Sequence, residues 1–174
     1  MAEDFATRVW IRAGLAVPAA TTIALVVAAA LPVHVLFYAN VAPALGLMGV
    51  YFWTLRRPDL MPNSVVFAAG LLQDVLLGTH LGVFTLVFLI ARTVVDDARP
   101  AILGRPYWAF WLGFGMVSAA AMVVAWGLVS ILSGHPTAIM SAAFTSLMPF
   151  VVFPAAAWVL AKADRLIVAP EGAP

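Results

Sequence analysis

The chain has 174 residues, of which 64% are hydrophobic and 10% are charged, and its formal net charge is +1. Its mean hydropathy is +1.05, so it holds far more apolar surface than a soluble domain of this length buries in one core. The small net charge excludes a strongly basic surface for nucleic acid, and the lack of cysteine excludes disulfides and thiolate chemistry. Composition therefore indicates a membrane protein.

Two long stretches contain no Lys, Arg, Asp or Glu. They run from Ala13 to Leu55 and from Pro106 to Ala161. A spanning helix needs about 20 predominantly apolar residues, so each stretch predicts a pair of helices. Strands are not expected, because a membrane barrel requires alternating apolar and polar residues, whereas these stretches are apolar on every side.

The first half of the chain contains three predicted helices, at about Ala13–Tyr38, Pro43–Leu55 and Asn63–Leu77. Asn40 is predicted to form the turn between the first two. The second helix is short and ends at "RRPD", residues 56–59. The third is entered through Pro62 and Asn63, which together are a signal for the start of a helix.

The second half contains three more predicted helices, at about Leu81–Val95, Tyr107–Leu132 and Thr137–Lys162. A tight turn at residues 78–80 precedes the first of these, and "RTVVDDARPAILGRP" is predicted to form a charged loop before the second. "SGHP", residues 133–136, turns the chain into the last helix. A disordered tail is expected at about 168–174, and residues 1–174 are predicted to form a single integral membrane domain.

All nine basic residues lie at alternate connections along the chain. They are Arg8, Arg12, Arg56, Arg57, Arg92, Arg99, Arg105, Lys162 and Arg165. Because Lys and Arg accumulate in cytoplasmic loops, this pattern predicts an all-α, polytopic helical bundle with six transmembrane segments and both termini in the cytoplasm. The same pattern holds if segments 63–77 and 81–95 form a re-entrant hairpin instead of spanning the bilayer.

"GLLQDVLLG" places Gln73 and Asp74 inside an otherwise apolar stretch. Gly70, Asp74 and Gly78 recur every fourth residue, so they share a helix face that another backbone can approach closely. Asp74 is expected to face protein, because an acid in lipid costs about 2.5 to 3.5 kcal/mol. Two interpretations stay open: a structural tie within the bundle, for example to the Thr79 turn, or a contact with another protein's helix or a ligand. For a tie or a helix contact, Asp74→Asn should be mild and Asp74→Leu worse.

The polar inventory is poor for enzyme chemistry. Membrane hydrolases and lipid transferases need paired acids, a nucleophile with a base, or a metal cluster. Asp74 is the one deeply placed acid, and the adjacent pair Asp96–Asp97 fits a solvated ion-pair face. The three histidines, His34, His80 and His135, fall at predicted outer ends and are interpreted as solvated turns. We predict no catalytic residue, no metal site and no cofactor.

Two central segments resemble the family of the rod shape-determining protein MreD, a bacterial inner-membrane family of about this length. They are "YFWTLRRPD", residues 51–59, and "FAAGLLQDVLLGTHLGVFTL", residues 67–86. The family shows a short aromatic-rich helix that ends in Arg-Pro, then Gly-Leu-x-x-Asp running into Gly-x-x-Leu-Gly. The matching motif positions here are Arg56, Arg57, Pro58, Gly70, Gln73, Asp74, Gly78 and Gly82. His80 departs from the proline or small turn residue of many members.

The resemblance implies a non-enzymatic scaffold of the cell-wall elongation (rod) complex, which builds peptidoglycan and maintains cell shape. Its partners would be MreC, the glycosyltransferase RodA, a penicillin-binding transpeptidase, the MreB cytoskeleton (directly or indirectly) and membrane lipid. The implied fold is similar to the S component of energy-coupling-factor transporters. The alternative is a small-molecule or lipid-binding membrane module such as a transporter S component, which should line an outer cavity with polar groups.

Overall fold

The computed structural model describes residues 2–31, 38–133 and 139–167, with side chains for 16–31, 41–133 and 148–165. In this part of the chain there are six α-helices, one short 3-10 helix and no strand, so the predicted all-α class is confirmed. The elements are α1 (Ala2–Ala29), α2 (Tyr38–Arg56), η1 (Pro58–Leu60), α3 (Asn63–Leu77), α4 (Val83–Ile102), α5 (Tyr107–Ser133) and α6 (Ile139–Ile167). The predicted tail lies outside the described residues.

The predicted bounds fit α3 and α5 best and α1, α2 and α4 least. Helix α1 begins at Ala2 and ends at Ala29, and α2 begins at Tyr38. Asn40 therefore lies inside α2, and the turn predicted there is wrong. Asparagine is only a weak helix breaker, and Pro43 removes one hydrogen bond from α2 without ending the helix.

The charged segment after residue 95 was predicted as a loop, but most of it is the C-terminal part of α4. Val87, Ala91 and Val95 are buried at a spacing of four residues, so the apolar stripe of this helix continues past Arg92. Helix α4 lies against α2 and α5. The stripe holds this segment in the helix, and the connection to α5 is reduced to residues 103–106.

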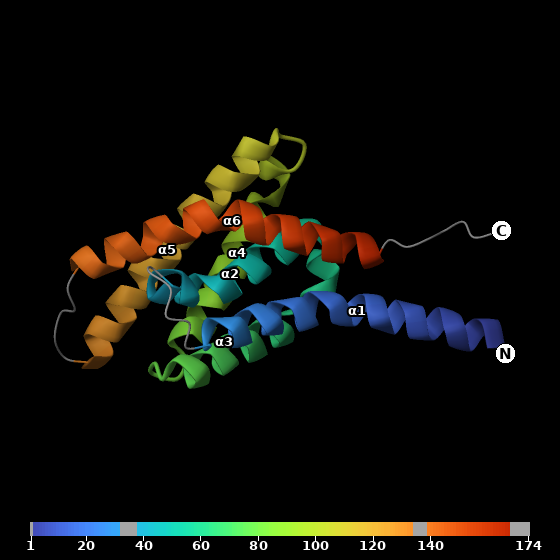
Figure 1. Cartoon of the computed structure of the whole chain (residues 1–174), viewed down its shortest axis with the longest axis horizontal. Coiled ribbons are helices and arrows are strands. Elements are labelled where there is room, and N and C mark those ends of the chain that lie inside the picture. The colour runs from blue at the N-terminus through green and yellow to red at the C-terminus, as the bar shows by residue number, and fades with distance from the viewer. Residues whose placement is uncertain (1, 32–37, 134–138, 168–174) are drawn as a thin grey trace.

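Helix α2 is the centre of the bundle and contacts each of the other five α-helices. Tyr51, Phe52 and Trp53 are fully or almost fully buried, as are most residues from Val41 to Leu55. A helix that is apolar on all sides is stable only when other helices surround it. The uniform apolarity of this segment therefore explains its central place (Figure 1).

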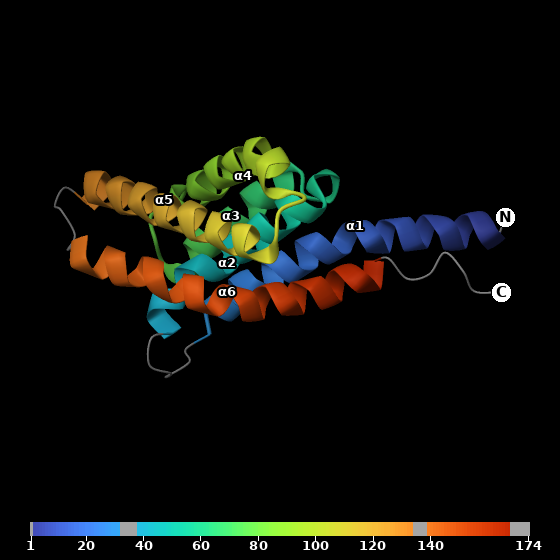
Figure 2. The same ribbon diagram turned by 90° about the horizontal axis from the view of Figure 1, so that it is seen from above.

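The ends of the helices alternate between two sides of the bundle. The N-terminal end of α1 and the C-terminal end of α6 lie at the same end of the molecule in both views, while the turn between α3 and α4 lies at the opposite end (Figures 1 and 2). Helix α2 ends on the side of the termini, where η1 leads to α3. This arrangement gathers the basic connections at one end.

The outer surface of the bundle carries large apolar side chains. Met116 and Ile131 on α5 are 76% and 79% exposed. A soluble monomer rarely exposes such surface over many helices, whereas a lipid-facing surface requires it. Within the described residues, α5 is the helix that is both long and apolar enough to cross a membrane, and 16–29 and 63–77 are shorter apolar helices.

We expect Gly70→Ala to destabilise the fold. A Cβ atom at Gly70 would lie 2.5 Å from the Thr85 Cα atom, because α3 and α4 approach closely there. Overpacking of this kind costs about 1 to 3 kcal/mol. Gly127→Ala is the matched control, since a Cβ atom there meets nothing within 4 Å. Thermal unfolding of the detergent-purified protein measures the difference, and equal midpoints for the two variants would contradict the close contact.

Candidate functional site

The turn between α3 and α4 depends on two glycines with positive φ. Gly78 follows the last residue of α3 at φ 64°, and its N–H donates to the Asp74 and Val75 carbonyls. Gly82 precedes the first residue of α4 at φ 100°. Residues with an L side chain rarely adopt these values, so glycine is favoured at both motif positions. The turn brings the start of α4 back alongside the last turn of α3.

The carboxylate of Asp74 lies inside this turn and is fully buried. It accepts five hydrogen bonds from its own chain, all at 2.9 to 3.2 Å. The donors are the Thr79 and Thr85 hydroxyl groups and the N–H groups of Gly82, Phe84 and Thr85. An ionised carboxylate only accepts hydrogen bonds, so its chemistry matches a cage made entirely of donors.

This cage caps helix α4 from outside the helix. The first N–H groups of any α-helix have no partner within the helix, and Gly82 has no side chain to replace one. Asp74 binds the N–H groups of Gly82, Phe84 and Thr85, and the intervening Val83 N–H donates to the His80 carbonyl. The negative charge also faces the positive end of the helix dipole. This geometry favours the structural tie over contact with another protein or a ligand.

Gln73 connects the same helix to α2. Its Nε2 atom donates to the Pro43 carbonyl at 2.7 Å, and the side chain is fully buried. Its Oε1 atom has no hydrogen-bond partner among the described residues and lies against Gly46, where a Cβ atom would collide with it. The adjacent motif residues Gln73 and Asp74 thus bind different neighbours, α2 and α4.

Arg56, Arg57 and Pro58 lie far from this cage, at the end of α2. Arg56 and Arg57 contact the Asp164 carboxylate of α6 at 3.6 and 3.5 Å. The Asp164 side chain is only 12% exposed, so this charged group ties α2 to α6 near the end of the bundle. Pro58 has no N–H with which to continue the hydrogen bonds of α2, so α2 ends at Arg56 and η1 begins at Pro58. The structure therefore divides the eight motif residues between two ends of the bundle.

Sequence reasoning missed three charged residues at the basic end. The Nε atoms of Arg99 and Arg92 donate to the carbonyls of Leu55 and Met61 at 3.0 and 2.8 Å, and Asp164 binds the two arginines of α2. The last carbonyls of a helix lack partners within it, and Arg99 supplies one for α2. The buried stripe of α4 was the available signal, since it places Arg92 and Arg99 in a helix.

The histidines do not form a site in the described part of the chain. His80 is exposed in the turn after α3, while His34 and His135 lie outside the described residues. Within the described residues no group of three His, Cys, Asp or Glu side chains is placed to hold a metal ion.

Comparison with known families gives one match that covers most of the chain. The model of the family described as rod shape-determining protein MreD matches residues 11–155. The chain belongs to the MreD family. The comparison with curated proteins gives no match, and neither does the comparison with solved structures.

Membership of the MreD family establishes the function at a coarse level. The chain is a membrane protein related to the determination of rod shape, and its family is one of structural proteins rather than a known enzyme family. The matched residues include the Asp74 cage and the arginines at the basic end, from Arg56 to Arg99. Asp164 lies beyond the matched residues.

The cage changes the expectation that Asp74→Asn is mild. Each carboxylate oxygen accepts at least one backbone N–H, so an asparagine NH₂ group must face such a donor in either orientation. An unpaired buried N–H costs about 1 to 3 kcal/mol, so we expect Asp74→Asn to lower the free energy of unfolding by that amount. Asp74→Leu leaves three backbone donors unpaired and should be worse.

Asp97→Asn is the matched control for Asp74→Asn, because Asp97 is an exposed acid on α4. The thermal unfolding midpoints of purified wild type and variants provide the measurement. If Asp74→Asn unfolds at the same temperature as Asp97→Asn, the hydrogen-bonded cage does not contribute to stability as described.

Proposed function

We propose that the chain is a non-enzymatic, multi-pass subunit of the bacterial cell-wall elongation complex in the inner membrane. It would hold MreC close to RodA and the penicillin-binding transpeptidase, with the MreB cytoskeleton as a direct or indirect partner. The observation that carries this proposal is the MreD family match over residues 11–155. Its mechanism is helix packing: the bundle offers a rigid apolar surface on which a partner's membrane helix can dock.

The proposed topology has six membrane segments and both termini in the cytoplasm. Support comes from the nine basic residues, which lie at alternate connections in the sequence. Further support is that the N-terminal end of α1 and the C-terminal end of α6 lie at the same end of the bundle, as an even number of crossings would require (Figures 1 and 2). Arg56 and Lys162 then lie on the cytoplasmic side, and the Asp74 cage lies near the outer side. The proposed fold remains similar to that of transporter S components.

The buried polar groups favour a scaffold over a vitamin-binding S component. Such a component needs polar groups that converge on an open outer cavity. The carboxylate of Asp74 is the deepest acid on the proposed outer side, and donors of its own chain surround it. Gln73 likewise uses its amide nitrogen to hold the Pro43 carbonyl. The Asp74 carboxylate and the Gln73 amide nitrogen are therefore already bound within the fold.

A complementation experiment tests the proposed function. Tagged wild type should restore rod shape to cells that lack their own copy, and should co-purify MreC. Gly70→Leu should insert but give rounded cells and recover less MreC, since leucine separates α3 from α4. Gly127→Ala is the control and should behave as wild type. Rod shape restored without recovery of MreC would contradict the scaffold.

Orientation is checked in the same strains with single cysteines, because the chain contains none. His80→Cys should react with a membrane-impermeant maleimide in intact cells, whereas Asp59→Cys and Asp97→Cys should react only after permeabilisation. Labelling of Asp59→Cys from outside would overturn the proposed topology. Correct labelling of the Gly70→Leu background shows that its loss of function does not come from failed insertion.

A further inference from the structure

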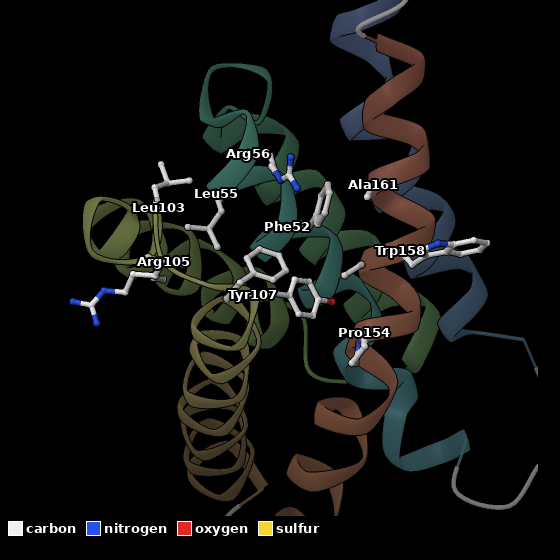
Figure 3. A pocket seen from close by; sticks show the side chains of 13 residues that line it. Phe52, Leu55, Arg56, Leu103, Arg105, Tyr107, Pro154, Trp158 and Ala161 are labelled. Carbon is white, nitrogen blue, oxygen red and sulfur yellow. The ribbon is translucent and has the colours of Figure 1, made fainter.

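A cavity of about 530 Å³ opens at the basic end of the bundle (Figure 3). Its walls come from α2, from the connection between α4 and α5, and from the facing sides of α5 and α6. Phe52, Leu55, Phe110 and Ala157 make the lining largely apolar. The size falls in the range of cavities that bind small ligands, which is about 300 to 1,000 Å³.

Positive charge lies at the margin of this apolar cavity. Arg56 lies beside Phe52 at one edge, and its guanidinium carbon is 5.7 Å from the centre of that ring. Arg56 and Arg57 share the single carboxylate of Asp164, so these three residues keep a net positive charge. The Arg56 side chain is 53% exposed, which leaves it accessible to an anion. Arg105 adds a second cation on the connection between α4 and α5, although its side chain points away from the cavity (Figure 3).

The neighbouring side chains place the cavity at the level of a membrane interface. Trp158 is 62% exposed on α6, and the Lys162 ammonium lies 3.8 Å from the centre of its ring. Exposed Trp and Lys side chains of membrane helices concentrate where acyl chains meet headgroups. In the proposed topology this interface is the cytoplasmic one, where anionic lipids are enriched. The cavity is therefore apolar where acyl chains lie and basic where phosphates lie.

We propose that this cavity binds one anionic phospholipid of the cytoplasmic leaflet. The headgroup phosphate lies at Arg56, and the upper part of an acyl chain lies between α5 and α6, against the accessible lining residues Tyr107 and Trp158. Basic pockets between membrane helices bind anionic headgroups in this way, because a charged hydrogen bond forms next to a low-dielectric lining. The site goes beyond the proposed function and rests on the proposed topology only for the assignment of the leaflet.

Native mass spectrometry of the full-length protein in detergent tests the site, with phosphatidylglycerol and phosphatidylcholine as probes. Wild type should retain one phosphatidylglycerol under activation that removes phosphatidylcholine. Ala161→Leu fills the cavity, and Arg56→Gln removes the cation that faces the phosphate, so each should bind phosphatidylglycerol roughly tenfold more weakly. Arg56→Lys keeps the charge and should retain part of the preference.

Arg165→Gln is the matched control, since it removes one positive charge from α6 without touching the cavity. Equal retention of the two lipids by wild type, or equal losses in Arg56→Gln and Arg165→Gln, would overturn the proposal in favour of unspecific attraction to surface charge. Unchanged retention in Ala161→Leu would also overturn it. The thermal unfolding midpoints of Ala161→Leu and Arg56→Gln, measured without lipid, are compared with that of wild type. If Arg56→Gln is unstable, the lipid retention of a folded Ala161→Leu decides the result.

Different measurements test the proposed lipid site and the proposed scaffold function. If wild type shows no lipid preference but restores rod shape and recovers MreC, only the lipid site is contradicted. If lipid binding depends on Arg56 and Ala161 but the chain never restores rod shape, only the scaffold function is contradicted.

Discussion

The Asp74 carboxylate holds together the turn between α3 and α4 by accepting hydrogen bonds from three of its backbone N–H groups. Five donors converge on it, and three of them are N–H groups that the start of α4 cannot satisfy within its own helix. Loss of the carboxylate would leave these donors unpaired at a fully buried position, which is costly. The close contact between Gly70 and Thr85 forms on the same face, so the cage and the helix packing depend on each other.

Helix α2 shows how a bundle of this kind fixes an element that has almost no polar surface. Apolar packing places α2 in the centre but does not by itself set its position along its axis. Polar contacts near both ends supply that position: Gln73 binds the Pro43 carbonyl, and Arg99 binds the Leu55 carbonyl. The ion pairs of Arg56 and Arg57 with Asp164 add α6 to the same arrangement. The proposed scaffold function would benefit from such fixed positions, because a partner's helix would meet a constant surface.

The sequence predicted the features that follow from local chemistry. Helical class, the glycine turn and the protein-facing place of Asp74 all follow from composition and from the spacing of Gly70, Asp74 and Gly78. It did not predict contacts between residues far apart in the chain. Asp164 lies just after the last predicted helix and carried no prediction, and Arg99 was predicted to lie in a loop. Trp111 is a similar case: its Nε1 atom donates to the Phe150 carbonyl, which Pro154 leaves without its usual helical donor.

Hydrogen exchange of single backbone amides in the wild-type protein, measured by NMR in micelles, tests whether Asp74 caps α4. The first amides of a helix normally exchange fast, because they lack partners within the helix. If Asp74 caps α4, the amides of Gly82, Phe84 and Thr85 exchange as slowly as amides in the middle of α4. Fast exchange at Phe84 and Thr85, with slow exchange from Leu86 onward, would contradict it and would show that Asp74 does not cap α4.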